Sequence, residues 1–125
     1  MPRPIQARID LAALRHNYLV AKKCVAGQGK PAKAWAVVKA DAYGHGLIRS
    51  AKALADIADG FALVEMDGAV ALRDAGLRQP VFLLEGFFEP EDIAVCAEYD
   101  LTASIHRIEQ LQMWPLLCPS PCQST

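Results

Sequence analysis

A lysine that ends an apolar run is the first candidate for chemistry in this sequence. Trp35, Val37 and Lys39 alternate with their neighbours, so their side chains share one side of a predicted strand. We expect the amine of Lys39 to emerge from largely apolar surroundings, which favour its neutral form. A neutral amine can attack a carbonyl carbon and form a Schiff base. A surface lysine that extends its charged end into water is the simpler alternative.

The residues that follow Lys39 favour the first interpretation. Gly44 and Gly46 flank a predicted step from strand to helix, where small residues let backbone N–H groups approach an anion. Tyr43 supplies a hydroxyl that could donate a hydrogen bond to a phosphate oxygen. Taken alone, however, the glycines are equally typical of an ordinary turn and the tyrosine of a half-buried packing ring.

Strands and helices alternate along the chain around this segment. We expect strands at residues 6–9, 34–38, 61–64, 81–84 and 101–105. Helices are expected to begin after Asp10 and Gly46, at Met66 and Pro90, and near Ile108. For the first of them, the apolar face is predicted to comprise Leu11, Leu14, Tyr18, Ala21 and Val25.

This α/β alternation predicts crossover connections and a parallel sheet. A (β/α)8 barrel of the TIM type needs about 250 residues. The 125 residues supply roughly four βα units after the first helix, so the predicted barrel is incomplete. An unclosed half-barrel exposes a strand edge and an apolar inner face, and we expect it to aggregate or dimerise.

The last twelve residues differ in composition from the rest. They hold two of the four cysteines and three of the eight prolines, and proline ends a helix. We therefore divide the chain into a partial barrel domain at 1–113 and an aberrant Pro/Cys-rich tail at 114–125. The hypothesis is a frameshifted or artificially ended reading frame, which the other two frames of the DNA beyond Gln112 would test.

Composition and charge exclude several classes of function. Hydrophobic residues make up 53% and charged residues 22%, as in an ordinary globular domain. The net charge is −1 and the basic residues form no stripe, which argues against nucleic acid as a partner.

No apolar stretch is long enough for a signal peptide or a membrane span, so we expect a cytoplasmic protein. Cys24, Cys96, Cys118 and Cys122 lack the spacing of a zinc site, and no metal is expected.

The segment from Val37 to Gly46, Val-Val-Lys-Ala-Asp-Ala-Tyr-Gly-His-Gly, resembles the cofactor-lysine motif of alanine racemases, which carry Asn or Asp at the position of Asp41. The resemblance extends over most of the chain and leaves out only the last dozen residues. It implies that the predicted half-barrel is the amino-terminal part of the family's barrel domain. Leu83 to Phe88 looks more like the catabolic branch than the biosynthetic one. The segments that carry the resemblance to the family, besides the lysine motif, are Arg3-Pro4, the helix start at Asp10, Gly60 to Leu63, Leu72 to Gly76, Leu83 to Phe88 and Ser104 to His106.

The resemblance implies a role for two residues. Lys39 would form the internal aldimine with pyridoxal 5'-phosphate and act as the base on one face of the substrate Cα, and Tyr43 would hold the cofactor phosphate. The implied reaction is the interconversion of L-alanine and D-alanine in a homodimer. The family's second base is a tyrosine of a later domain, contributed by the partner subunit. Tyr18 and Tyr99 lie in no matching motif and are not assigned to that role.

Two alternatives remain open. The chain could be a truncated, non-catalytic remnant that at most binds pyridoxal phosphate, because half the barrel and the second base are missing. A small single-domain pyridoxal-phosphate-binding barrel protein also carries a strand-end lysine, but that lysine lacks the continuation from Ala40 to Gly46. We assign no catalytic role to His16, His45, His106, Asp41 or Glu85.

Overall fold

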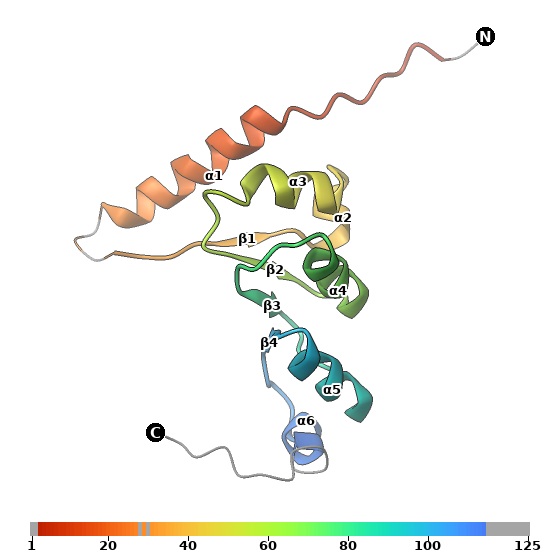
Figure 1. Ribbon diagram of the computed structural model, residues 1–125. Coiled ribbons are helices and arrows are strands. Elements are labelled where there is room, and N and C mark those ends of the chain that lie inside the picture. Colours follow the sequence, from red (N-terminus) through yellow and green to blue (C-terminus); the bar gives the residue numbers. More distant parts are fainter. Residues whose placement is uncertain (1–2, 28, 30, 115–125) are drawn as a thin grey trace.

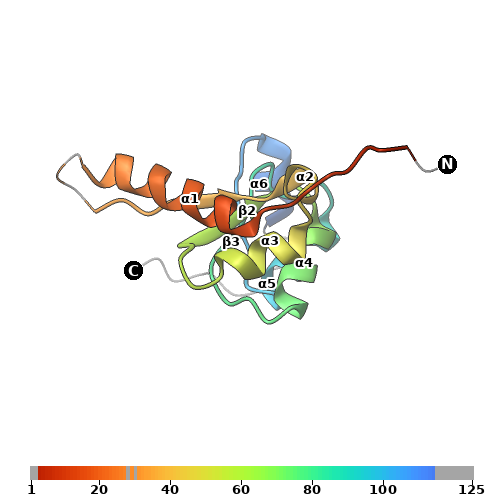
Figure 2. The same ribbon diagram turned by 90° about the horizontal axis from the view of Figure 1, so that it is seen from above.

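Helix α1 (Leu11–Ala26) is the first element of the computed structural model, which describes residues 3–27, 29 and 31–114. The helix begins where Asp10 accepts a hydrogen bond from the backbone N–H of Ala13 at 3.0 Å, as the sequence predicted. Leu14 and Tyr18 pack against the core, whereas Ala21 and Val25 are exposed. The predicted apolar face is therefore used only in the first half of α1, because the second half extends beyond the other elements (Figures 1 and 2).

Four parallel strands form one sheet, and their order in space is their order in the sequence. They are β1 (Trp35–Val37), β2 (Gly60–Leu63), β3 (Val81–Leu83) and β4 (Thr102–Ala103). Val37 pairs with Ala62, Ala62 with Phe82, and Phe82 with Thr102, so these residues lie at one level across the sheet. The predicted parallel sheet is confirmed.

Helices connect consecutive strands, as a parallel sheet requires. After the short α2 (Lys39–Tyr43), α3 (Leu47–Leu54) leads from β1 to β2, α4 (Met66–Asp74) from β2 to β3, and α5 (Pro90–Glu98) from β3 to β4. Helix α6 (Ile108–Met113) follows β4. No described helix combines the length and the hydrophobicity that a membrane crossing requires.

The core lies between the sheet and helices α3 and α4, which cover the same face (Figure 1). Phe61, Leu63, Leu72 and Val81 are almost completely shielded from solvent. All four residues of β2, which has a neighbouring strand on each side, are buried. Burial of this kind contributes roughly 1.5–3 kcal/mol for each large apolar side chain.

The opposite face of the sheet is open in the described chain. Trp35 is 45% exposed and Val37 is 40% exposed. The indole of Trp35 lies over Gly60, where an added Cβ would collide with it, and its ring centroid is 5.4 Å from that of Phe82. The expected apolar surroundings of Lys39 are therefore only half enclosed, because no described element covers this face.

Two further sequence predictions have specific outcomes. Residues 6–9 form no strand, because no described strand lies beside them to supply hydrogen bonds. The predicted tail at 114–125 lies outside the described residues, apart from Trp114. The division at residue 113 stays a prediction.

A buried arginine joins the two loops at the amino ends of β3 and β4. The guanidinium of Arg73 donates to the carbonyl oxygens of Leu77 (3.0 Å), Gln79 (2.7 Å), Tyr99 (2.8 Å) and Asp100 (2.8 Å). Sequence reasoning missed this contact, because an arginine at the end of an amphipathic helix is usually exposed.

Candidate active site at the end of strand β1

Lys39 lies directly beyond β1, at the carboxyl edge of the sheet. The ladder continues to Val38, whose N–H donates to Ala62 O at 2.8 Å, and therefore holds the backbone up to the lysine. Lys39 is half-buried and takes part in none of the three ion pairs formed among the described residues. Catalytic and ligand-binding groups collect at this edge in α/β folds.

The backbone after Lys39 adopts a left-handed helical turn. Ala40, Asp41, Ala42 and Tyr43 have φ values of 52°, 55°, 54° and 55°. Each non-glycine residue in this conformation costs roughly 1–2 kcal/mol relative to a right-handed helix. Four such residues in succession are not explained by local preference, so the rest of the structure must hold them in place.

Hydrogen bonds to the flanking residues Val38 and His45 provide part of that support. The amide of Ala42 donates to Val38 O at 3.0 Å, and the amide of His45 donates to Ala42 O at 3.1 Å. The ring nitrogen Nδ1 of His45 lies 2.9 Å from the same Ala42 oxygen. His45 therefore helps to shape the turn.

Asp41 ties the left-handed turn to the next helix. Its Oδ1 atom accepts a hydrogen bond at 2.8 Å from the N–H of Leu47, the first residue of α3. An amide oxygen accepts this bond as well as a carboxylate oxygen does, which explains in physical terms why Asn or Asp can occupy the position. The side chain of Asp41 is therefore a structural cap.

The amides of Gly44 and Gly46 are already occupied within the turn, so these two donors do not provide the anion contact that the sequence interpretation allowed. Gly44 N–H donates to the carbonyl oxygens of Ala40 (3.2 Å) and Asp41 (3.1 Å), and Gly46 N–H donates to Asp41 O at 2.9 Å. The two glycines have φ values of 88° and 95°, a region that side chains disfavour. They are needed for the backbone path, and the turn uses their donors internally.

Tyr43, like Asp41 and His45, is exposed to solvent in this turn. Its side chain is 61% exposed, and its hydroxyl forms no hydrogen bond with another described residue. It lines a hollow of about 310 Å³ beside β1, together with Val38, His45 and Ser50. Ser50 is buried, and its Oγ has no hydrogen-bond partner among the described residues.

Gln110 is a buried residue near the carboxyl ends of β3 and β4 whose side chain makes four hydrogen bonds to backbone groups. The sequence analysis did not identify it. The residue is only 3% exposed. Its Oε1 accepts hydrogen bonds from the backbone amides of His106 (2.8 Å) and Arg107 (3.2 Å). Its Nε2 donates hydrogen bonds to the backbone oxygens of Glu85 (3.1 Å) and Phe87 (3.0 Å). The position three residues after Arg107, at a helix start, is the signal that could have indicated a capping role.

His106 and Glu85 contact each other without forming a chemical site. Nε2 of His106 lies 2.9 Å from the backbone oxygen of Glu85, so the carboxylate is not involved. Phe87 is buried and Phe88 is exposed, in line with core and surface packing. The described residues hold no group of three or more metal-binding side chains.

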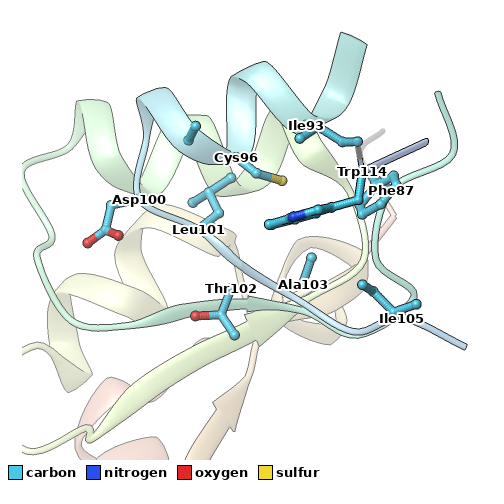
Figure 3. A pocket seen from close by; sticks show the side chains of 10 residues that line it. Phe87, Ile93, Cys96, Asp100, Leu101, Thr102, Ala103, Ile105 and Trp114 are labelled. Carbon is cyan, nitrogen blue, oxygen red and sulfur yellow. The ribbon is translucent and has the colours of Figure 1, made fainter. Parts of the chain in front are cut away.

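A larger hollow of about 420 Å³ lies away from Lys39, between α5 and β4. Figure 3 shows Phe87, Ile93, Cys96 and Trp114 around it, so that its lining is mainly apolar. Burial raises the pKa of the Cys96 thiol, which disfavours the nucleophilic thiolate. We therefore place the candidate site at Lys39 and not at this larger hollow.

Comparison with known proteins extends the likeness over most of the chain. A family model described as "Alanine racemase, N-terminal domain" matches residues 9–121. Over 110 residues the chain is 53% identical to an alanine racemase of Pseudomonas entomophila and 52% identical to a protein of Pseudomonas putida named "Alanine racemase, catabolic". These matches cover 88% of this chain and 29% of each relative, so the chain spans less than a third of their length.

Solved structures give the same result. A biosynthetic alanine racemase from Pseudomonas aeruginosa superposes with a TM-score of 0.80 at 39% identity, covering 86% of this chain and 29% of that one. An alanine racemase from Acinetobacter baumannii has a TM-score of 0.75 at 31% identity, with 84% and 30% covered. Relatives of both named branches are thus similar, and assignment to the catabolic branch stays a prediction.

Proposed function

Because the chain belongs to the alanine racemase family through the family's amino-terminal domain, we propose that Lys39 and Tyr43 are the cofactor-binding residues of a pyridoxal-phosphate-dependent racemase that interconverts L-alanine and D-alanine. The four-stranded sheet is the amino-terminal part of the family's TIM-type barrel, as the sequence predicted. The racemase activity, the alanine substrate and the homodimer are proposed for the whole protein. This chain spans less than a third of the length of its relatives.

The left-handed turn immediately after Lys39 is the observation that carries this proposal. Four consecutive residues with φ between 52° and 55° store several kcal/mol of backbone strain. Strain of this kind persists where a defined position of a side chain is needed, and it clusters at functional sites. Here it fixes the direction in which the chain leaves Lys39 and the side of the turn from which Tyr43 projects.

The two side chains suit the two ends of the cofactor. Pyridoxal phosphate has an aldehyde, which reacts with an amine, and a phosphate, which accepts hydrogen bonds. Lys39 supplies the amine, and the Tyr43 hydroxyl supplies a donor without a partner among the described residues. The donors of Gly44 and Gly46 are occupied within the turn, which supports Tyr43 as a phosphate contact of this segment.

The residues of this chain supply the acid–base group for one of the two faces of the substrate Cα. The bound cofactor acts as an electron sink for the substrate Cα. Lys39 Nζ removes or returns the Cα proton on one face, and Tyr43 fixes the orientation of the site through the phosphate. Asp41 and His45 hold the turn that positions both residues.

Inversion of configuration requires a second base on the other face, and no described tyrosine is placed for it. The hydroxyl of Tyr18 is occupied at the amino end of β1, where it donates to Ala34 O at 2.9 Å and accepts from Asp59 N at 3.1 Å. Tyr99 lies before β4, at the amino edge of the sheet. This favours a second candidate function, in which the chain by itself binds the cofactor without racemising alanine.

Reductive trapping tests the proposal. The purified chain is treated with pyridoxal phosphate and borohydride, and the labelled lysine is located by peptide mapping. We expect selective labelling at Lys39 and its loss in Lys39→Ala, whereas the exposed-lysine control Lys52→Ala retains it. Labelling spread evenly over several lysines would refute the assignment. Alanine racemisation by the chain alone, lost in Lys39→Ala, would show that a second base is present and exclude the non-catalytic alternative.

A further inference from the structure

Ala40, the residue directly after Lys39, is an alanine at a position that suits glycine. Its φ and ψ are 52° and 50°, in the left-handed region where the Cβ of an L-residue lies too close to the following carbonyl oxygen. Its side chain is exposed in the described chain, whereas Ala42, which is also left-handed, is 7% exposed. Glycine at position 40 would therefore relieve strain without removing a buried methyl group.

The methyl group of Ala40 restricts the backbone next to the lysine. For residues with a Cβ the left-handed region is small, with φ of about 50–70° and ψ of about 30–60°, whereas glycine ranges more widely. The peptide unit between Lys39 and Ala40 is planar, so its rotation changes ψ of Lys39 and φ of Ala40 together. A narrow range of φ at Ala40 therefore also narrows the range of ψ at Lys39.

Backbone hydrogen bonds leave this peptide unit to the restriction by the methyl group. The ladder of the sheet ends at Val38, whose N–H donates to Ala62 O at 2.8 Å, and the bonds of the turn resume at Ala42, whose N–H donates to Val38 O at 3.0 Å. The N–H of Ala40 takes part in none of the backbone hydrogen bonds that join the turn to the described residues around it. The unit between Lys39 and Ala40 therefore lies between two hydrogen-bonded stretches.

We propose that Ala40 is a positioning residue for Lys39. Its methyl group keeps the peptide unit beyond the lysine in one orientation, and so limits the movement of the Lys39 Cα between the strand and the turn. Ala40 contacts no reacting atom and acts only through the backbone of Lys39. This inference rests on the proposed function of Lys39, and it explains why a strained alanine stands where glycine would fit.

Two substitutions at position 40 test the role of the methyl group. Ala40→Gly keeps the path of the turn open and removes the restriction, so we expect the rate of borohydride labelling at Lys39 to fall about two- to fivefold. Ala40→Asn keeps a Cβ, and asparagine is enriched in the left-handed region, so the rate should return to that of the parent chain. Labelling in Ala40→Gly at the parent rate overturns the proposal.

Stability is expected to move differently from labelling. In Ala40→Gly the denaturant midpoint should stay unchanged or rise, because relief of strain offsets the greater freedom that glycine gives the unfolded chain. Slower labelling then cannot result from unfolding. A fall in the midpoint in proportion to the fall in labelling would show that Ala40 acts on stability alone, and would contradict the positioning role.

Asp100 offers a matched control. It is the one non-glycine residue outside the turn, among those that the structure describes, with a positive φ, and this φ is 51°. It is exposed and follows α5 at the amino edge of the sheet, away from Lys39. Asp100→Gly makes the same kind of backbone change and should leave labelling of Lys39 unaltered. An equal fall in Asp100→Gly would assign the effect to general loosening and overturn the proposal.

Visible circular dichroism of the bound cofactor provides a readout of orientation. The signal is divided by the fraction of chains labelled, so that it reports how firmly each cofactor is held and not how many are bound. We expect this ratio to fall in Ala40→Gly and to return in Ala40→Asn. A merely structural role would change the amount bound at a constant ratio, so an unchanged ratio contradicts the positioning role.

Hydrogen exchange in the cofactor-free chain separates this inference from the proposed function. The amides of Ala42 and Gly44 are expected to exchange about two- to fivefold faster in Ala40→Gly, and at the parent rate in Asp100→Gly. Equal exchange in Ala40→Gly and the parent chain overturns the restraint by Ala40. Absence of selective labelling at Lys39 in the parent chain would instead refute the proposed function, while exchange still decides whether Ala40 restrains the turn.

Discussion

The carboxylate of Asp41 accepts a hydrogen bond at 2.8 Å from the backbone N–H of Leu47, six residues further along the chain. This contact joins the left-handed turn after Lys39 to the first turn of α3. The strained segment is thereby attached to a regular helix whose residues Ala51 and Leu54 are buried in the core. The position of Lys39 is therefore coupled to the side chain of Asp41, to which the sequence analysis assigned no catalytic role.

Replacing Asp41 tests this dependence. Asp41→Ala removes the acceptor for Leu47 N–H, and we expect a loss of about 1 kcal/mol in the free energy of unfolding, the usual effect of deleting a helix cap. Cofactor trapping at Lys39 should fall as well. Asp41→Asn keeps an acceptor oxygen and is the control. Denaturant unfolding and borohydride labelling measure the two effects; equal losses in Ala and Asn variants would contradict the capping role.

Tyr43→Phe tests the assigned phosphate contact. The variant keeps the ring and removes the hydroxyl, so we expect pyridoxal phosphate to bind roughly tenfold more weakly, the effect of losing one hydrogen bond to a charged group. Pyridoxal has the same aldehyde and no phosphate, and its binding should not change. Absorbance titration with both compounds makes the comparison. A similar loss for both compounds would mean that Tyr43 acts on the turn and not on the phosphate.

Arg73 is expected to be important for stability alone. Arg73→Lys keeps the charge but has only three donors and no rigid planar group to direct them, so at least one of the four carbonyl oxygens loses its donor. We expect a loss of about 2–4 kcal/mol in the free energy of unfolding. Arg78→Lys, at an exposed position of the same loop, is the control. Thermal unfolding measures the difference, and a midpoint unchanged in Arg73→Lys would contradict this account.

Asp59 gives the protein a dependence on acid pH. The Ala34 amide first, and then Lys22, lower the pKa of Asp59 below its ordinary value of 3.8. A carboxyl whose folded pKa is depressed stabilises the folded state above its unfolded pKa, and this contribution is lost as the pH falls through the folded pKa. Stability should therefore decline below about pH 4, and less steeply in Asp59→Asn. Unfolding free energies measured across this range test it; identical slopes in both proteins would refute it.

Much of the fold could be predicted, because the residues that begin and end its helices lie at or next to those helices in the sequence. Asp10 starts α1, Pro90 starts α5, and Gly76, with φ at 87°, follows the end of α4, as expected. The spacing of apolar residues then gave the alternation of strands and helices. Residues 6–9 were predicted incorrectly because a strand also requires a neighbour, which local pattern does not report.

The sequence by itself determined the family, the parallel half-barrel and the place of Lys39 and Tyr43 in a turn after β1, because these depend on residue types at short spacing. Only the tertiary structure decided that four residues of the turn are left-handed, that the glycine donors are occupied, and that Arg73 and Gln110 are buried. Each of these depends on backbone groups that the fold brings together: Arg73 meets Tyr99, and Gln110 meets Glu85. Such contacts arise from chain geometry and have no periodic signal in the sequence.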